Sequence, residues 1–463
     1  MSDFRDNARF LSDWIAAYLD DPSRYPVLAR VTPGDIRDAL PSHAPEHGET
    51  FAQIFADFER VLVPGLTHWN HPGFFAYFAS SASEPGVLAE FLSAALNQQA
   101  MLWRTSPAAT ELEEVALGWL RRLIGLPDVF EGVIYDTASI STLHALAAAR
   151  EAAVPDVRRA GLAGRADLKG VRVYASEQAH SSVDKAVIAL GLGHDALIRI
   201  SVDAAFRMEP ARLADRLRAD RDAGLLPIAV VATVGSTSTT SVDPVAAIAD
   251  ICAAHGVWLH VDAAYAGVAA MVPGWEWILD GAARADSLVV NPHKWLFTPF
   301  DLSAFYCRRM DMVRAAFSLT PEYLKTSEGD AGVTNLMDTG IQLGRRFRAL
   351  KLWMILRHFG AAGLRARIAE HMRLARLFAS WVDASDTYEL AAPVPFSVVC
   401  FRMRGTRGDA DHQRVLDAVN ASGEVFLSHT KLDGRFVLRL AIGHLLTAES
   451  HVRRAWELLN SAV

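Results

Sequence analysis

Apolar residues recur at helical spacing in two stretches near the N-terminus, within residues 10–19 and 51–62. Apolar positions three and four residues apart predict amphipathic helices. Residues 25–49 between them are rich in proline and show no such period. Because two helices joined by such a loop bury little surface on their own, we expect this segment to pack on something else, such as a second subunit.

A third helix with clear ends is predicted by the stretch SPAATELEEVALGWLRRLIGLP, residues 106–127. Ser106 is suited to cap its N-terminus and Pro107 to its first turn. Gly125 follows the last residue of the apolar period, where a helix commonly ends.

From about residue 130, short apolar runs alternate with helical stretches. The runs lie at residues 132–136, 171–176, 227–235, 257–267, 286–292 and 303–307. Strand–helix alternation with unbroken apolar strands predicts an α/β fold whose mainly parallel sheet is covered on both faces. Ligands bind such sheets beyond the carboxyl ends of the strands, so the polar residues that close these runs are functional candidates.

The pattern changes again near residue 350. A long helix is followed by apolar runs at 396–403 and 435–443, which predict a small α+β domain with antiparallel strands. We therefore predict three parts: an N-terminal helical segment at 1–83, a large α/β domain at 84–350 and a small C-terminal α+β domain at 351–463.

Composition narrows the class of protein. The 463 residues are 51% hydrophobic and 21% charged, with a net charge of −7 and no basic stripe, so nucleic acid and anionic membrane are poor partners. The three cysteines lie far apart and form no metal or redox motif. No apolar run reaches the ~20 residues of a membrane helix, and the N-terminus lacks a signal-peptide core. We expect a cytoplasmic protein without a metal.

Five predicted strands end in residues with notable chemistry. The first is followed by small hydroxyl residues at 137–142 and then a helix, an arrangement that suits a phosphate, although ordinary helix capping is the commoner reason for such a stretch alone. The other strands end in His180, in Ser236 and Thr237, in Asp262 with two alanines after it, and in Asn291, His293 and Lys294.

Lys294 is one of only six lysines among 46 Lys and Arg residues. A desolvated lysine can lose its proton and act as a nucleophile, which arginine cannot do, although a surface lysine lying along apolar neighbours fits the fragment equally well. The five strand ends together fit one ligand, an aldehyde cofactor with a pyridine ring and a phosphate. Lys294 would form the Schiff base, Asp262 would hold the ring nitrogen, and His180 would stack on the ring.

Seven motifs resemble those of the group II pyridoxal-phosphate-dependent decarboxylases, and most closely the aromatic L-amino acid decarboxylases, of bacterial type. They are HPGFFAYFASSASEPG, SPAATELE, EQAHSSVDKA, WLHVDAAYAG, NPHKWL, PEYLK and LGRRFRALKLW. The resemblance runs from about residue 1 to 460. It implies a fold-type-I homodimer with pyridoxal 5′-phosphate as cofactor, an N-terminal segment that clasps the partner, and an active site at the subunit interface.

By position, the resemblance implies catalytic roles for Lys294, Asp262, His180 and Tyr323. Tyr323 matches a tyrosine on a mobile loop that the partner subunit supplies and that protonates the substrate carbon. Relatives with phenylalanine there form an aldehyde, so tyrosine predicts simple decarboxylation. The residues that would surround the cofactor besides Lys294, Asp262 and His180 are Thr137, Ala138, Ser139, Thr237, Ala264, Asn291 and His293.

The predicted substrate pocket has aromatic walls, which favour an aromatic side chain, although some of these rings are expected to be core. It comprises Trp69, Tyr77, Phe78, Ser80, Gln99, Met101 and, across the dimer, Gly344. Indole-preferring plant relatives carry glycine at the matching position, which favours tryptophan and leaves phenylalanine, tyrosine and dopa open. Ser80, Gln99 and Met101 depart from the animal relatives.

We find no basic residue near these motifs and so expect no acidic substrate such as glutamate. The predicted reaction converts an aromatic L-amino acid to an arylalkylamine and CO2. Aldehyde formation or other chemistry of this fold is the alternative, and cofactor binding without turnover is a distant third.

Overall fold

The computed structural model describes residues 4–319 and 333–463, so Tyr323 lies outside the described residues. The chain forms two compact units. Unit 1 comprises Met1–Ala79, Leu374–Ala391 and Phe401–Val463, and unit 2 comprises Ser80–Arg373 and Ala392–Cys400. The predicted boundaries at residues 83 and 350 stay predictions.

Unit 2 is built on a seven-stranded sheet in the order β2-β8-β7-β6-β5-β3-β4. Neighbouring strands from β4 to β7 are parallel, whereas β8 is antiparallel to both β7 and β2. The predicted α/β fold with a mainly parallel sheet is confirmed. The strands are β2 (Glu131–Tyr135), β3 (Val171–Ser176), β4 (Leu197–Ile200), β5 (Leu226–Thr233), β6 (Trp258–Asp262), β7 (Ser287–Val290) and β8 (Ser303–Cys307).

The strand directions bring the predicted functional residues to one edge of this sheet. Because β2 and β7 are both antiparallel to β8, β2 runs in the same direction as β7 and its parallel neighbours. The carboxyl ends of β2, β3, β5, β6 and β7 therefore all lie at the same edge, and each is followed by one of the predicted site segments.

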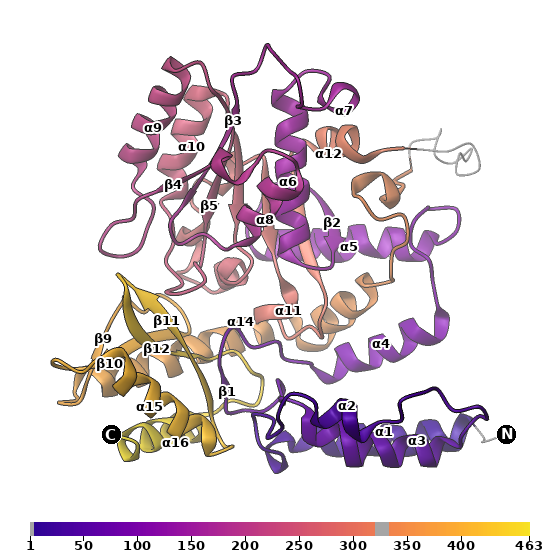
Figure 1. Ribbon diagram of the computed structural model, residues 1–463. Coiled ribbons are helices and arrows are strands. Elements are labelled where there is room, and N and C mark those ends of the chain that lie inside the picture. The colour runs from indigo at the N-terminus through magenta and orange to yellow at the C-terminus, as the bar shows by residue number, and fades with distance from the viewer. Residues whose placement is uncertain (1–3, 320–332) are drawn as a thin grey trace. The chain divides into compact units, whose positions relative to one another are not determined.

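Helices cover the sheet and explain why its central strands are almost wholly buried. Helix α6 (Ala138–Ala153) lies across the sheet in Figure 1 and contacts β5, β6, β7 and β8. It also packs on α8 (Ser182–Ala189) and α12 (Met310–Phe317). Helices α9 (Pro210–Asp222) and α10 (Val245–His255) contact each other and β5.

Helix α5 (Pro107–Leu123) begins where the sequence predicts it. Ser106 occupies the N-cap position and Gly125 follows the C-cap residue, Ile124, with a positive φ. The predicted cap by the Ser106 side chain is wrong, because its hydroxyl points to Gln98 Oε1, 3.5 Å away, and makes no capping hydrogen bond. The other helices of unit 2 are α4 (Glu84–Leu96), α7 (Val157–Ala160), α11 (Pro292–Trp295) and the first part of α14 (Ala349–Asp383).

Unit 1 joins the N-terminal helices to a five-stranded sheet in the order β1-β11-β12-β10-β9. The pairs β9/β10 and β11/β12 are antiparallel, as predicted, and β1 from the N-terminal segment adds in parallel to β11. The N-terminal segment therefore packs on the C-terminal part of its own chain. The elements of unit 1 include α1 (Phe4–Asp20), α2 (Asp35–Ala39), α3 (Phe51–Asp57), β1 (Phe74–Phe75), the last part of α14, β9 (Tyr388–Leu390), the second half of β10 (Val398–Met403), α15 (Asp409–Ala421), β11 (Phe426–Leu432), β12 (Arg435–Ala441) and α16 (Glu449–Ser461).

None of the helices in the described residues has both the length and the apolar character that crossing a bilayer requires.

Candidate active site

Asp262 and Lys294 are held at the ends of two neighbouring strands by backbone hydrogen bonds. Asp262 pairs with Val289 in the β6/β7 register, and the N–H of Asn291 donates to Ala264 O at 2.9 Å. The N–H of Lys294 donates to Asn291 O, also at 2.9 Å. The carboxylate and the amine predicted from the sequence thus come from adjacent strand ends of a rigid sheet.

The Asp262 carboxylate is buried, with 6% of the residue exposed. Its hydrogen-bond partner among the described residues is the backbone N–H of Ala264, at 3.1 Å. A buried carboxylate is costly unless a cation or several donors compensate it. This carboxylate is therefore suited to hold a protonated ring nitrogen.

Lys294 lies half-buried on α11 between two buried residues, His293 and Trp295. The Trp295 indole donates to His371 Nδ1 at 3.0 Å and stacks on Tyr265 with ring centroids 4.8 Å apart. These contacts of the neighbouring Trp295 fix the backbone that carries Lys294. His293 Nδ1 accepts the N–H of Leu302 at 2.9 Å, and burial lowers the pKa of His293 to about 3.

His180 follows β3, and its side chain is exposed in the single chain. Its Nδ1 accepts the N–H of Ser182 at 3.1 Å, so the ring proton lies on Nε2. The pKa of His180 is lowered mainly by desolvation and next by the nearby charge of Lys294, whereas Asp262 raises it. His180 is therefore a neutral flat ring close to both Lys294 and Asp262, as stacking on a cofactor requires.

The turn after β2 leaves the N-terminus of α6 open. Thr137 is the N-cap residue but its side chain makes no capping hydrogen bond, so ordinary capping does not account for this hydroxyl. The N–H groups of Ile140 and Ser141 donate to Thr137 O, whereas those of Ala138 and Ser139 have no hydrogen bond within the described chain. Free N–H groups at the start of a 16-residue helix are suited to a phosphate.

The residues present fit an aldehyde cofactor with a pyridine ring and a phosphate. Ala138, Ala264 and Val289 form a small apolar cluster, in which Ala138 and Ala264 keep a little exposed surface. The Oδ1 atom of Asn291 is buried and finds no hydrogen-bond partner in the part of the chain that the structure describes. Thr237 lies exposed in the turn after β5. The open helix end, the apolar surface and the buried carboxylate therefore lie in one unit with Lys294.

Four of the predicted substrate residues belong to unit 2. Ser80 Oγ donates to His293 O at 2.9 Å, directly before Lys294. Gln99 lies against Gly344, because a Cβ on Gly344 would come within 3.2 Å of Gln99 Nε2. Met101 packs on Leu102 and Met337.

The other three, Trp69, Tyr77 and Phe78, belong to unit 1. The rings of Trp69 and Tyr77 stack with centroids 6.0 Å apart. The buried Arg439 lies over the Phe78 ring at 4.6 Å and donates to Tyr77 O. The expectation of no basic residue near these motifs is therefore wrong. An arginine between the apolar residues of β12, which begins with the exposed Arg435, was the available signal.

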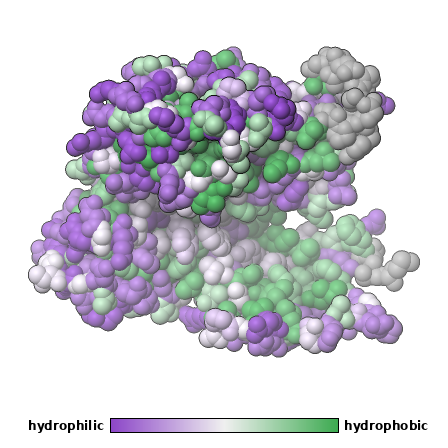
Figure 2. Space-filling view, turned by 45° about the horizontal axis from the view of Figure 1, so that its top comes forward, coloured by the Kyte–Doolittle hydropathy of each residue, from purple (hydrophilic) through white to green (hydrophobic). Residues whose placement is uncertain are grey.

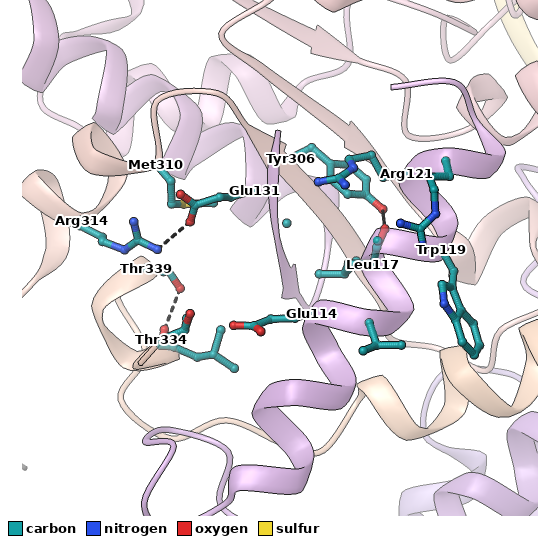
Figure 3. A pocket seen from close by; sticks show the side chains of 15 residues that line it. Glu114, Leu117, Trp119, Arg121, Glu131, Tyr306, Met310, Arg314, Thr334 and Thr339 are labelled. Atoms are coloured by element: carbon teal, nitrogen blue, oxygen red, sulfur yellow. Dashed lines mark hydrogen bonds and ion pairs between the residues drawn. The ribbon is translucent and has the colours of Figure 1, made fainter. Parts of the chain in front are cut away.

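A cavity of about 480 Å³ lies elsewhere in unit 2, lined by α5, α12 and the first residues of β2 (Figure 3). Glu131 and Arg314 form an ion pair of 2.7 Å in its wall. Glu131 is the first residue of β2, whereas Thr137 follows its last residue. The cavity therefore lies at the opposite end of this strand from the sheet edge that carries Lys294 and Asp262.

Comparison with known proteins shows one family. The pyridoxal-dependent decarboxylase conserved domain matches residues 33–404. The chain is 40% identical to phenylacetaldehyde synthase of Arabidopsis thaliana, covering 98% of this chain and 94% of the relative. It is 40% identical to aromatic-L-amino-acid decarboxylase of Sus scrofa, covering 98% and 95%. The crystal structure of Oryza sativa TDC with PLP and tryptamine superposes with a TM-score of 0.95 at 39% identity, covering 99% of this chain and 97% of that one.

These relatives come from plants and animals and give no support to the predicted bacterial type. The predicted fold-type-I class is confirmed by the superposition. The chain belongs to the pyridoxal-dependent decarboxylases, in their aromatic amino acid decarboxylase branch, and it is a carboxy-lyase whose cofactor is pyridoxal 5′-phosphate.

Proposed function

We propose that the protein converts an aromatic L-amino acid, with tryptophan preferred, to the corresponding arylalkylamine and CO2. The observation that carries this proposal is the alignment of Lys294, the buried Asp262 and the open N-terminus of α6 on one sheet edge. The likeness to a structure that holds tryptamine, together with Gly344, supports tryptophan.

Each residue of the site has a distinct task in this proposal. When bound, the cofactor would supply an aldehyde for the substrate amine and a protonated ring to take up the electron pair that stays on the substrate carbon as CO2 leaves. Lys294 holds the aldehyde before the substrate arrives, and Asp262 keeps the ring nitrogen protonated. The neutral His180 stacks on the ring, and the N–H groups of Ala138 and Ser139 bind the phosphate.

Tyr323 is our proposed proton donor to the substrate carbon, on the basis of its match to the family tyrosine. The likeness to phenylacetaldehyde synthase favours aldehyde formation as a second candidate function. A tyrosine at position 323 supports decarboxylation. Tyr323→Phe is expected to release hydrogen peroxide and an aryl acetaldehyde in oxygenated buffer. If this variant still made only amine, the role of Tyr323 would be wrong.

The test of the reaction is a panel of tryptophan, phenylalanine, tyrosine and dopa, with CO2, amine, aldehyde and peroxide measured together. We expect equal amounts of CO2 and amine, with the highest kcat/KM for tryptophan. Lys294→Ala is expected to abolish turnover, whereas Lys431→Ala, which replaces an exposed lysine of β11, is a matched control that keeps full activity. Absence of CO2 release with every substrate would overturn the proposal.

We also propose a homodimer with the active site at its interface. Helix α4 exposes an apolar stripe at the helical spacing of one face, made of Leu88, Phe91, Leu92 and Leu96. Figure 2 shows apolar side chains gathered on the surface, where a monomer would leave them in water. Phe91→Glu is expected to shift the mass measured by light scattering from dimer to monomer, and a wild-type monomer would refute the dimer.

A further inference from the structure

A buried ion pair joins two distant parts of unit 2. Glu113 on α5 and Arg345 leave only 2% and 7% of their side chains exposed. Arg345 Nη2 donates to Glu113 Oε1 at 2.8 Å, and Nη1 donates to Oε2 at 3.3 Å. Burying two charges is costly unless their remaining hydrogen-bonding groups also find partners, so the other contacts of the pair indicate its use.

The pair satisfies the outer edge of β2, which is an edge strand of the seven-stranded sheet. The N–H of Ile134 donates to Glu113 Oε1 at 2.8 Å, and Arg345 Nη2 donates to Ile134 O at 2.6 Å. Both backbone groups of Ile134 are thus bound by side chains in place of a neighbouring strand. Ile134 lies three residues before Thr137, so the pair holds the strand that carries the phosphate turn, residues 137–139.

The backbone of Arg345 holds the proposed substrate residues at the same time. Its N–H donates to Gln99 Oε1 at 2.6 Å, and its carbonyl accepts the N–H of Ala100 at 2.9 Å. Gly344 precedes it and lies against Gln99. One residue therefore binds the phosphate-turn strand through its side chain and the Gln99–Gly344 segment through its backbone.

We propose that Arg345, fixed by Glu113, is a positioning residue that holds the Gln99–Gly344 segment, whose Gly344 would reach the pocket of the partner subunit, in a set place relative to the phosphate turn of its own chain. Through that segment it determines which aromatic side chain is preferred. This inference rests on the proposed function. Because the guanidinium fork contacts Glu113 and Ile134 together, a lysine with its single ammonium group cannot reproduce both contacts.

The test compares Arg345→Lys with Arg346→Gln, a control in the same GRRF motif whose side chain is 59% exposed and pairs with Glu90 at the surface. For Arg345→Lys we expect the ratio of kcat/KM for tryptophan to kcat/KM for phenylalanine to change by about tenfold, because small displacements of positioning groups cost up to ~10²-fold. The affinity of the apoprotein for pyridoxal 5′-phosphate, measured by fluorescence quenching, should also fall, whereas Arg346→Gln should match the wild type in both.

Glu113→Gln is a second variant, for use if Arg345→Lys fails to fold. It keeps the shape of the side chain and an oxygen that can accept the N–H of Ile134. It should change the substrate ratio in the same direction. If the folded variants lost stability but kept the wild-type substrate ratio and cofactor affinity within twofold, the pair would be purely structural and the inference overturned. Since cofactor affinity is measured without substrate, absence of turnover in the wild type would refute the proposed function and not this coupling.

Discussion

Gly235→Ala is expected to destabilise the protein at the point where β5 meets the cofactor-binding loop. Gly235 has φ +87°, which a residue with a Cβ adopts at a cost of ~1 kcal/mol or more. The added Cβ would lie 2.6 Å from Ala266 Cβ and 3.1 Å from Ala266 N, both buried. Overpacking of this kind costs about 1–3 kcal/mol. We therefore expect a loss of about 2–4 kcal/mol in the free energy of unfolding.

The matched control is Gly256→Ala at the end of α10. Gly256 also has a positive φ, +59°, but a Cβ there would meet no atom within 4 Å. This variant should lose only the backbone cost of ~1 kcal/mol. Urea unfolding of both apoproteins measures the difference, and a fluorescence titration of Gly235→Ala should show weaker cofactor binding because Ala264 is displaced. Equal losses in the two variants would refute the close contact between Gly235 and Ala266.

Three further predictions concern single side chains. Tyr77 is 56% exposed and has φ 50°, a backbone conformation that glycine adopts without strain. Tyr77→Gly should therefore keep the stability measured by thermal unfolding or raise it by up to ~1 kcal/mol, whereas its kcat/KM should fall. Asp262→Asn should lower kcat by ~10²-fold or more in the amine assay, yet stabilise the apoprotein by removing a buried charge. Burial lowers the pKa of His144 to about 3. Below pH ~6.5 the unfolded chain therefore binds a proton that the folded protein does not, which lowers the free energy of unfolding by about 2 kcal/mol at pH 5. In urea unfolding, the free energy of unfolding of His144→Phe should therefore fall less between pH 7 and pH 5 than that of the wild type, by the same amount.

The sheet that carries the site was predictable because its strands are buried on both faces. The apolar runs of these strands are unbroken, so the sequence shows where each strand ends. Asp262 and Lys294 close two successive runs, which are neighbouring strands of the sheet. The strands β1 and β4 were not predicted. β4 has two half-buried or exposed residues among its four, and β1 consists of Phe74 and Phe75 alone, so neither carries a periodic signal.

Side-chain partners far apart in the sequence could not be predicted. Glu113 and Arg345 are separated by 232 positions, and the sequence shows only an acid within a helix and a pair of arginines in a loop. Arg439 is a charged residue within a run of apolar ones and gives no sign of its partner, yet it is buried against Phe78. A closer pair was missed as well: the Ser106 hydroxyl could have capped α5, but it points to Gln98, eight residues earlier.

Two buried carboxylates in unit 2 show how partners separate a structural acid from a functional one. Glu113 has an arginine fork and a backbone N–H, so the chain itself compensates its charge. Asp262 is nearly as buried, but its hydrogen bond among the described residues comes from a single backbone N–H. A protein keeps such a carboxylate where an external cation completes it, and a protonated pyridine ring supplies that cation. Neutralising Asp262 should therefore raise the free energy of unfolding of the apoprotein. Neutralising Glu113 would leave the charge of Arg345 buried without its counter-charge and should lower it.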